Sequence, residues 1–233
     1  GGQRGGAHGR GAPQGGGSAF FIGAGAMGSC FTKPADLSPI VHLYRRSAFL
    51  FKHQYEDDPL TGEFFFSDCI AHLERALEVT QTTDVTFMEL GCGVGLGPVI
   101  AKTYGLTAFY GVDINRRLID VAERNLAHLL EQGLLPHENP PVYIWGNFFT
   151  KEQLAVIRDE VRERAYPHLI LENPYSDSDV YEQLGILFDA IDVFYMYPFY
   201  KMDFGCDYFF RFFRQRAKKG AVLLLKDGRM ERK

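Results

Sequence analysis

The sequence has few cysteines and no closely spaced pair of them. Its four cysteines, Cys30, Cys69, Cys92 and Cys206, lie far apart in a chain of 233 residues. Zinc sites and disulfide-rich scaffolds use paired or regularly spaced cysteines. The sequence therefore predicts no metal site and favours a reduced, intracellular compartment.

Long apolar runs are also missing. Charged residues or glycines interrupt every apolar stretch well before the ~20 residues that a membrane-spanning helix needs. No basic segment followed by an apolar one stands at the start of the sequence. We therefore expect neither a secretory signal nor attachment to a membrane.

An excess of positive charge is a third absence. The formal net charge is −4, with 46% hydrophobic and 23% charged residues, as in ordinary globular proteins. This balance argues against a protein that its overall field holds on nucleic acid. A basic cluster at 211–219 is interpreted as a solvated helix face. This cluster, or the glycine-rich tail with Arg4 and Arg10, is where a DNA contact would lie.

The composition divides the chain into three parts. Residues 1–35 begin with a glycine-rich stretch that can bury too little apolar surface to offset its ordering entropy, so we predict a flexible tail, part of it cloning-derived. Residues 36–80 combine aromatic and basic side chains with a helix expected at 67–79, and we predict a small N-terminal helical lid. Residues 81–233 form the main domain.

Strand and helix patterns alternate through the main domain. Repeated βα units build a mainly parallel sheet with helices on both faces. The expected strands are 85–90, 107–112, 142–145, 168–172 and 221–225. The expected helices are 96–104, 116–131, 151–164, 178–190 and 206–219. Residues 191–196 fit a further strand or an inserted element, and the last residues fit a truncated sheet or a final hairpin.

A glycine-rich turn follows the first of these strands. Gly91, Gly93 and Gly95 come directly after Glu89 and before a helix. Glycines let the backbone approach a ligand closely, and the helix presents free N–H groups to it. Asp113 stands at the end of the next strand, 24 residues after Glu89. A carboxylate at that position can accept both hydroxyls of a ribose. We predict a nucleoside site; a nucleotide-binding oxidoreductase or a turn without ligand are the alternatives.

Further positions complete the predicted site. Asn147 follows the strand 142–145, where an amide can contact an adenine, and Phe148 can pack on that ring or belong to the core. Asn173 and Tyr175 follow the strand 168–172. Carbonyl oxygens there can hold a substrate nitrogen in position for reaction, so we predict these two residues as catalytic. A plain Asn-Pro turn is the alternative.

The run Glu89–Gly97, followed by Tyr110-Gly111-Val112-Asp113, resembles the first motif and the ribose-binding acid of class I, seven-stranded, S-adenosylmethionine-dependent methyltransferases. The similarity covers residues 85–226. It implies a Rossmann-like fold, S-adenosyl-L-methionine as the cofactor of region 81–233, and methyl transfer as the activity. The cofactor-binding residues that it implies are Glu89, Gly91, Gly93, Gly95, Asp113, Asn147, Phe148 and Asn173.

Within this class the sequence is most similar to the non-SET histone-lysine methyltransferases named for disruptor of telomeric silencing. The segments that carry the similarity are Gly62-Glu63, Tyr110–Asp113, Gly146–Glu152, Glu172–Tyr175 and Lys218–Val222. It implies Glu63 as a further cofactor-binding residue, a lysine of a nucleosomal histone as acceptor, and a nuclear chromatin regulator. Phe64 in place of a threonine, and the stretch 191–205, depart from that family's pattern.

Two other functions stay open. The loop at Asn173 also resembles the Asn/Asp-Pro-Pro-Tyr of amino-group methyltransferases that act on adenine in nucleic acid or on protein glutamine. The other is a cofactor-binding subunit without activity, with the aromatic stretch 194–213 as its interface. The helical period of that stretch equally fits a buried core.

Overall fold

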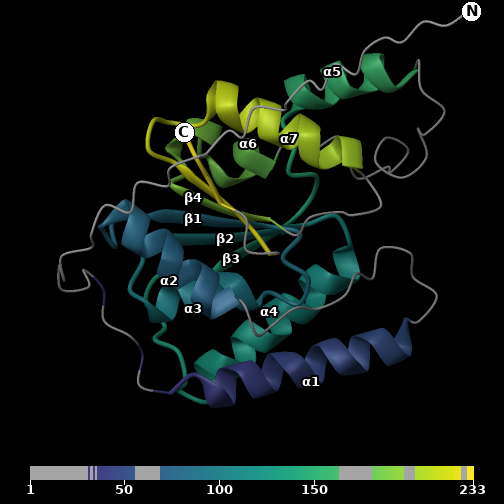
Figure 1. Ribbon diagram of the computed structural model, residues 1–233. Coiled ribbons are helices and arrows are strands. Elements are labelled where there is room, and N and C mark those ends of the chain that lie inside the picture. Colours follow the sequence, from purple (N-terminus) through teal and green to yellow (C-terminus); the bar gives the residue numbers. More distant parts are fainter. Residues whose placement is uncertain are drawn as a thin grey trace, which may run out of the picture.

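The computed structural model describes residues 31, 34, 36–55, 69–162, 180–196, 203–226 and 230–233. This part of the chain has three layers, a sheet between two groups of helices (Figure 1). The predicted tail up to residue 30, Glu63, and the predicted strand 168–172 with Asn173 and Tyr175 lie outside the described residues.

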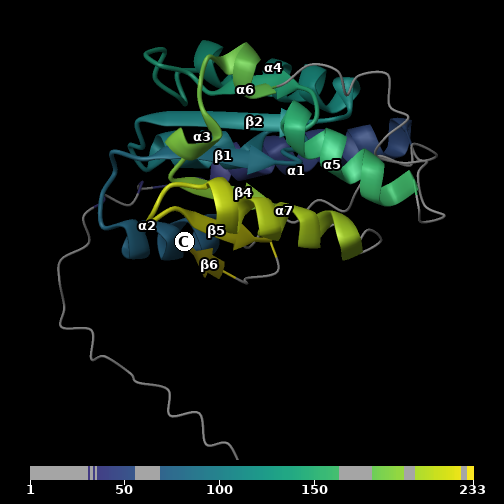
Figure 2. The same cartoon turned by 90° about the horizontal axis from the view of Figure 1, so that it is seen from above.

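A six-stranded sheet forms the middle layer, in the order β3-β2-β1-β4-β5-β6. Most of this succession can be followed in Figure 2. The strands are β1 (Thr86–Leu90), β2 (Ala108–Asp113), β3 (Val142–Trp145), β4 (Val193–Met196), β5 (Val222–Leu225) and β6 (Met230–Arg232). All pairs are parallel except β5 with β6. The order reverses direction at β1, and such a reversal is where doubly wound α/β proteins bind ligands.

Four helices cover one face of the sheet: α1 (Ser38–Gln54), α2 (Cys69–Thr80), α3 (Leu96–Thr103) and α4 (Arg116–Glu131). In α1 the buried residues Ile40, Tyr44, Ala48 and Phe51 recur at helical spacing. They join a core that includes Phe87 of β1. The described parts of 36–80 thus share one core with the sheet, and a function as a lid stays a prediction.

The opposite face is covered by α5 (Lys151–Arg162), α6 (Val180–Leu184), the short 3-10 helix η1 (Phe188–Ala190) and α7 (Asp203–Arg216). Aromatic rings dominate this core. The ring of Phe194 lies 5.9 Å from that of Phe209 and 5.8 Å from that of Phe213, edge to face, and all three are buried. The rings of Phe194, Phe209 and Phe213 are therefore core, and an interface through the rest of the aromatic stretch 194–213 stays a prediction.

The predicted strands and helices that fall within the described residues are confirmed, except for the helix 178–190, and two open alternatives are decided. Residues 193–196 are a strand beside β1, and not an insertion. The predicted helix 178–190 is instead α6 and η1, separated at Gly185, whose φ of 64° ends α6. At the other end of the domain, β6 pairs with β5 as a hairpin.

Candidate functional site

The loop after β1 lies at the carboxyl edge of the sheet, against the end of β2. Gly91, Gly93 and Gly95 have φ values of 74°, 57° and 91°, which residues with a Cβ rarely adopt. The amides of Gly91 and Cys92 both donate to the carbonyl of Val112, at 2.8 and 3.0 Å. The backbone of the loop is therefore fixed to β2, and its conformation requires these glycines.

Asp113 ends β2 and faces this loop. One carboxylate oxygen accepts the amide of Gly93 at 2.8 Å, and the other accepts the amide of Asn115, also at 2.8 Å. Burial raises the pKa of Asp113, while these amide hydrogen bonds oppose the shift. A carboxylate has about four acceptor sites, so both oxygens keep room for a hydroxyl donor. The structure thus brings Gly93 and Asp113 together, as the sequence predicts.

Both carboxylate oxygens of Glu89 have partners inside the protein. One carboxylate oxygen accepts the amide of Gly97 at 3.1 Å, at the start of α3, and the other lies 2.7 Å from Nζ of Lys226. Burial raises the pKa of Glu89, and the ammonium of Lys226 opposes that shift. The pKa of Lys226 is raised, because the carboxylate of Glu89 more than offsets the lowering by burial.

Lys226 is a further site residue, which is not predicted from the sequence. It directly follows β5, two strands away from β1 in the sheet. Its only signal in the sequence is a lysine immediately after the apolar run Val222–Leu225. A charge at that point lies at the carboxyl edge of a parallel sheet, where ligands gather.

Close packing leaves no room for a side chain at two further glycines, Gly97 and Gly111. A Cβ at Gly97 would collide with the carboxylate of Glu89, and a Cβ at Gly111 would lie 2.7 Å from the ring of Tyr143. Tyr143, on β3, is buried behind the glycine loop. No function is predicted for Tyr143 from the sequence, although it precedes Asn147 on the same strand-loop unit.

Two polar side chains connect the loop to α4 and, through it, to α1. The amide nitrogen of Asn125, in α4, donates to the carbonyl of Val94 at 3.3 Å. The side-chain oxygen of Asn125 in turn accepts the hydroxyl of Ser47, in α1, at 2.7 Å. Asn125 is buried, so this chain of contacts fixes α1 and α4 to the back of the loop.

Asn147 and Phe148 follow β3, as predicted, but both make internal contacts. The side-chain oxygen of Asn147 accepts the amide of Phe149 at 3.0 Å. The ring of Phe148 lies 4.8 Å from that of Phe149 and 5.7 Å from that of Phe209. These contacts favour the core interpretation of Phe148, and contact of either residue with an adenine stays a prediction.

The remaining predicted residues cannot be placed in the site. Glu63, Asn173 and Tyr175 lie outside the described residues. The strand beside β1 on the side away from β2 is β4, which ends at Met196. Within the described residues, β4 is therefore the strand that borders β1 on this side, and the catalytic assignments stay predictions.

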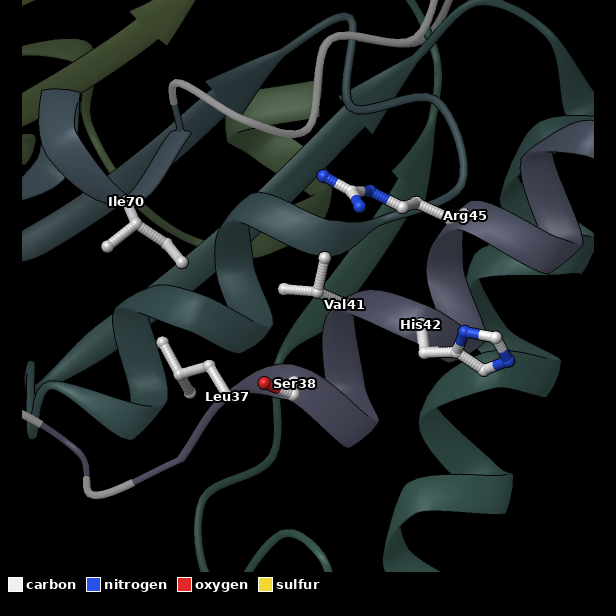
Figure 3. Close-up of a pocket in the computed structure, with 6 residues that line it drawn as sticks. All are labelled: Leu37, Ser38, Val41, His42, Arg45 and Ile70. Atoms are coloured by element: carbon white, nitrogen blue, oxygen red, sulfur yellow. The ribbon is translucent and has the colours of Figure 1, made fainter.

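A hollow of about 400 Å³ lies apart from this site, between α1 and α2. Figure 3 shows its lining, which consists of Leu37, Ser38, Val41, His42, Arg45 and Ile70.

Within the described ranges, no group of three or more His, Cys, Asp or Glu residues could hold a metal ion. In the same part of the chain, none of the helices combines the length and the apolar character needed to cross a membrane.

No protein-family model and no curated protein matches the sequence. Solved structures do match. A putative S-adenosyl-L-methionine-dependent methyltransferase from Methanococcus maripaludis aligns over 83% of this chain and 64% of its own, with 13% identity and a TM-score of 0.43. A methyltransferase from Thiobacillus denitrificans, in complex with S-adenosyl-L-homocysteine, aligns over 76% and 54%, with 16% identity and a TM-score of 0.42.

An RNA methyltransferase from Salinibacter ruber, also in complex with S-adenosyl-L-homocysteine, aligns over 70% of this chain and 76% of its own, with 14% identity and a TM-score of 0.42. This chain spans less than two thirds of the length of the first two structures. Similarity this distant concerns the fold alone. The Rossmann-like α/β architecture itself is confirmed by the sheet order and the two helical layers.

Proposed function

We propose that the protein is an S-adenosyl-L-methionine-dependent methyltransferase whose cofactor site is the loop Glu89–Gly97 with Asp113. The observation that carries this proposal is the hydrogen bond from the Gly93 amide to Asp113, which joins a glycine loop to a strand-end carboxylate. Both lie where the strand order reverses, at the carboxyl edge of the sheet.

Each part of the site has a chemical role in this proposal. Asp113 accepts the ribose hydroxyls through the acceptor capacity that its two amide hydrogen bonds leave free. The bare backbone of Gly91–Gly95 lies against the amino-acid end of the ligand, where a Cβ would obstruct it. When bound, the cofactor supplies an electrophilic methyl group on a sulfonium. The protein's contribution is then placement of the acceptor and exclusion of water.

For the acceptor we propose a lysine of a nucleosomal histone, and with it a nuclear chromatin regulator. The support is the succession of similar sequence segments from Gly62 to Val222. A lysine must lose its proton before it can attack a methyl group, and a desolvated site lowers its pKa. Asn173 and Tyr175 are the residues proposed to hold its nitrogen, with Glu63 as a further cofactor ligand.

The cluster 211–219 does not favour a DNA contact. The guanidinium of Arg211 lies 4.5 Å from the ring centre of Tyr208, and that of Arg214 lies 5.9 Å from the ring centre of Phe210. Lys218 forms a 2.6 Å ion pair with Asp192. These cations therefore contact neighbouring side chains of the protein, which agrees with a helix face that needs no DNA partner. A DNA contact through this cluster or the N-terminal tail stays a prediction.

Calorimetric titration with S-adenosyl-L-methionine, S-adenosyl-L-homocysteine and NAD⁺ tests the cofactor. We expect the two sulfur nucleosides to bind and NAD⁺ not to bind. Loss of a hydrogen-bonded carboxylate costs about 1.5–3 kcal/mol, so Asp113→Ala should weaken binding roughly 10- to 100-fold. Asp120→Ala is the matched control, because Asp120 is exposed and pairs with Arg116 on α4. Binding of NAD⁺ alone would replace the proposal by an oxidoreductase.

Transfer of tritiated methyl from the cofactor tests the acceptor. Nucleosomes, free histones, tRNA and DNA are assayed in parallel, with Asp113→Ala as the inactive control. Label on a histone lysine supports the proposed acceptor, whereas label only in nucleic acid or on glutamine supports the amino-group enzymes. Cofactor binding without transfer to any protein or nucleic-acid mixture would indicate the non-catalytic subunit.

A further inference from the structure

The ammonium of Lys226 is bound at the start of the glycine loop. Its Nζ lies 2.7 Å from a carboxylate oxygen of Glu89 and donates to the carbonyl of Gly91 at 3.4 Å. It also lies 5.3 Å from the ring centre of Tyr195. The side chains of Lys226 and Glu89 are only 12% and 3% exposed, so water contributes little to the solvation of either charge.

These three partners form a binding site for an alkylammonium group. A carboxylate gives a charge-assisted hydrogen bond, a backbone carbonyl gives a second acceptor, and the face of a tyrosine ring attracts a cation. The partners come from the end of β1 and from β4, which are adjacent strands. The group that occupies the site is the protein's own, from the end of β5.

We propose that Lys226 holds the place of the ligand's own ammonium: an amino-acid-bearing nucleoside that binds the loop displaces it from Gly91 and Glu89. This inference rests on the proposed function, because such a ligand carries an α-ammonium at the end opposite its ribose. It makes Lys226 a residue that sets the affinity for the amino-acid end and leaves the affinity for the nucleoside end unchanged.

Displacement follows from the charges. Glu89 is buried, and a buried carboxylate without a cation is strongly unfavourable, so the site is filled in the free protein. The other oxygen of Glu89 already accepts the Gly97 amide, and two ammonium groups at the one remaining oxygen repel each other, so the ligand's cation and Lys226 compete for it. The contact of Lys226 with Gly91 is long at 3.4 Å, and a lysine has a flexible stem that can carry its charge outward.

The test compares two ligands on two proteins. S-adenosyl-L-homocysteine carries the ammonium, and 5′-methylthioadenosine has the same nucleoside thioether without the amino-acid end. We expect S-adenosyl-L-homocysteine to bind Lys226→Met about tenfold more tightly than the wild-type protein, because its ammonium gains one charge-assisted hydrogen bond without competition. The affinity for 5′-methylthioadenosine should not change. An unchanged ratio of the two affinities assigns Lys226 a structural role only, and a fall in the ratio means that Lys226 instead binds the ligand's carboxylate. Either result overturns the inference.

A second measurement needs no variant. Wild-type protein is treated with formaldehyde and a borohydride, and the methylation rate of each lysine is followed by mass spectrometry. S-adenosyl-L-homocysteine should raise the rate at Lys226 several-fold, while 5′-methylthioadenosine leaves it unchanged and exposed Lys219 serves as the reference. A rate at Lys226 that stays equal or falls with S-adenosyl-L-homocysteine contradicts displacement. If neither nucleoside binds the wild-type protein, the proposed function and this inference both fail.

Discussion

The hydroxyl of Tyr143, on β3, donates a 2.5 Å hydrogen bond to the backbone carbonyl of Gly95, in the loop after β1. β3 and β1 are not neighbours, because β2 lies between them. The hydrogen bond therefore spans β2 and fixes the position of Gly95, the third glycine of the loop. Because Tyr143 is buried, this hydrogen bond makes the shape of the loop depend on β3 as well as on β2.

Removal of this hydroxyl should loosen the loop. Tyr143→Phe leaves the carbonyl of Gly95 without its donor, which should cost about 1–3 kcal/mol of unfolding free energy. Urea denaturation measures the loss, and calorimetric titration should show weaker binding of S-adenosyl-L-homocysteine. Tyr104→Phe is the matched control: it loses a 2.6 Å hydrogen bond to Glu74, away from the loop, and should keep full affinity. Equal affinities in both variants would show that Tyr143 has no part in shaping the site.

A methyl group at Gly97 should disturb the same loop from the other side. Its Cβ would collide with the carboxylate of Glu89, so Gly97→Ala has to shift the start of α3 and the loop before it. Overpacking of this kind costs about 1–3 kcal/mol, and cofactor affinity should fall with it.

Gly105→Ala provides the comparison for Gly97→Ala. Gly105 has open space around its Cβ position but a φ of 76°, so alanine there costs about 1–2 kcal/mol through backbone strain alone. Both variants should lose stability in urea, and only Gly97→Ala should lose affinity in the titration. An affinity loss of the same size in Gly105→Ala would mean that global destabilisation is the cause.

Removing one charge of the Glu89–Lys226 pair should lower the free energy of unfolding more than removing both charges. Lys226→Met leaves a buried carboxylate without its cation, which costs about 3–5 kcal/mol, whereas removing both charges of a buried pair is often close to neutral. The double variant Glu89→Gln, Lys226→Met keeps an oxygen acceptor for the Gly97 amide. Urea denaturation should therefore find it more stable than Lys226→Met. Additive losses in this double-mutant cycle would rule out a coupled pair.

Alkaline pH should destabilise the protein through its buried phenols. Burial raises the pKa of Tyr143 well above its usual range, and burial also raises that of Tyr44. In the unfolded chain these groups ionise near pH 10, roughly their ordinary value. Their contribution to stability is thus complete below about pH 10 and is lost as the pH rises through the folded pKa values.

The free energy of unfolding, measured in urea from about pH 9 to 11, should fall more steeply in wild-type protein than in Tyr143→Phe. Tyrosinate absorbance of the native protein should likewise lag behind that of the unfolded protein. A slope that the substitution leaves unchanged would show that Tyr143 does not contribute to the alkaline transition.

The sequence predicts the sheet and the contact of the glycine loop with Asp113 because both depend on local patterns. β1, β2 and β3 are short apolar runs followed by clear helical periods, and Gly93 meets Asp113 because consecutive parallel strands end at the same edge. In the sequence β4 is ambiguous, because an apolar run of four residues has no periodicity that distinguishes a central strand from an insertion.

The missed residues depend on contacts between distant segments. Tyr143 and Gly95 are 48 residues apart, and Ser47 and Asn125 are 78 residues apart. Nothing local marks either pair, because each forms only after the sheet order and the helix packing are set. A single apolar-looking tyrosine on a strand is equally well explained as core, which is also where it lies.

The longest of these contacts has a consequence for synthesis of the protein. Lys226 follows Gly91 by 135 residues, so a ribosome working at about 5–20 residues per second makes Lys226 roughly 7 to 27 s after Gly91. During that interval the nascent chain holds Glu89 without its cation. A carboxylate without its cation is costly to bury, so we expect the loop to reach its final form only after β5 has left the ribosome.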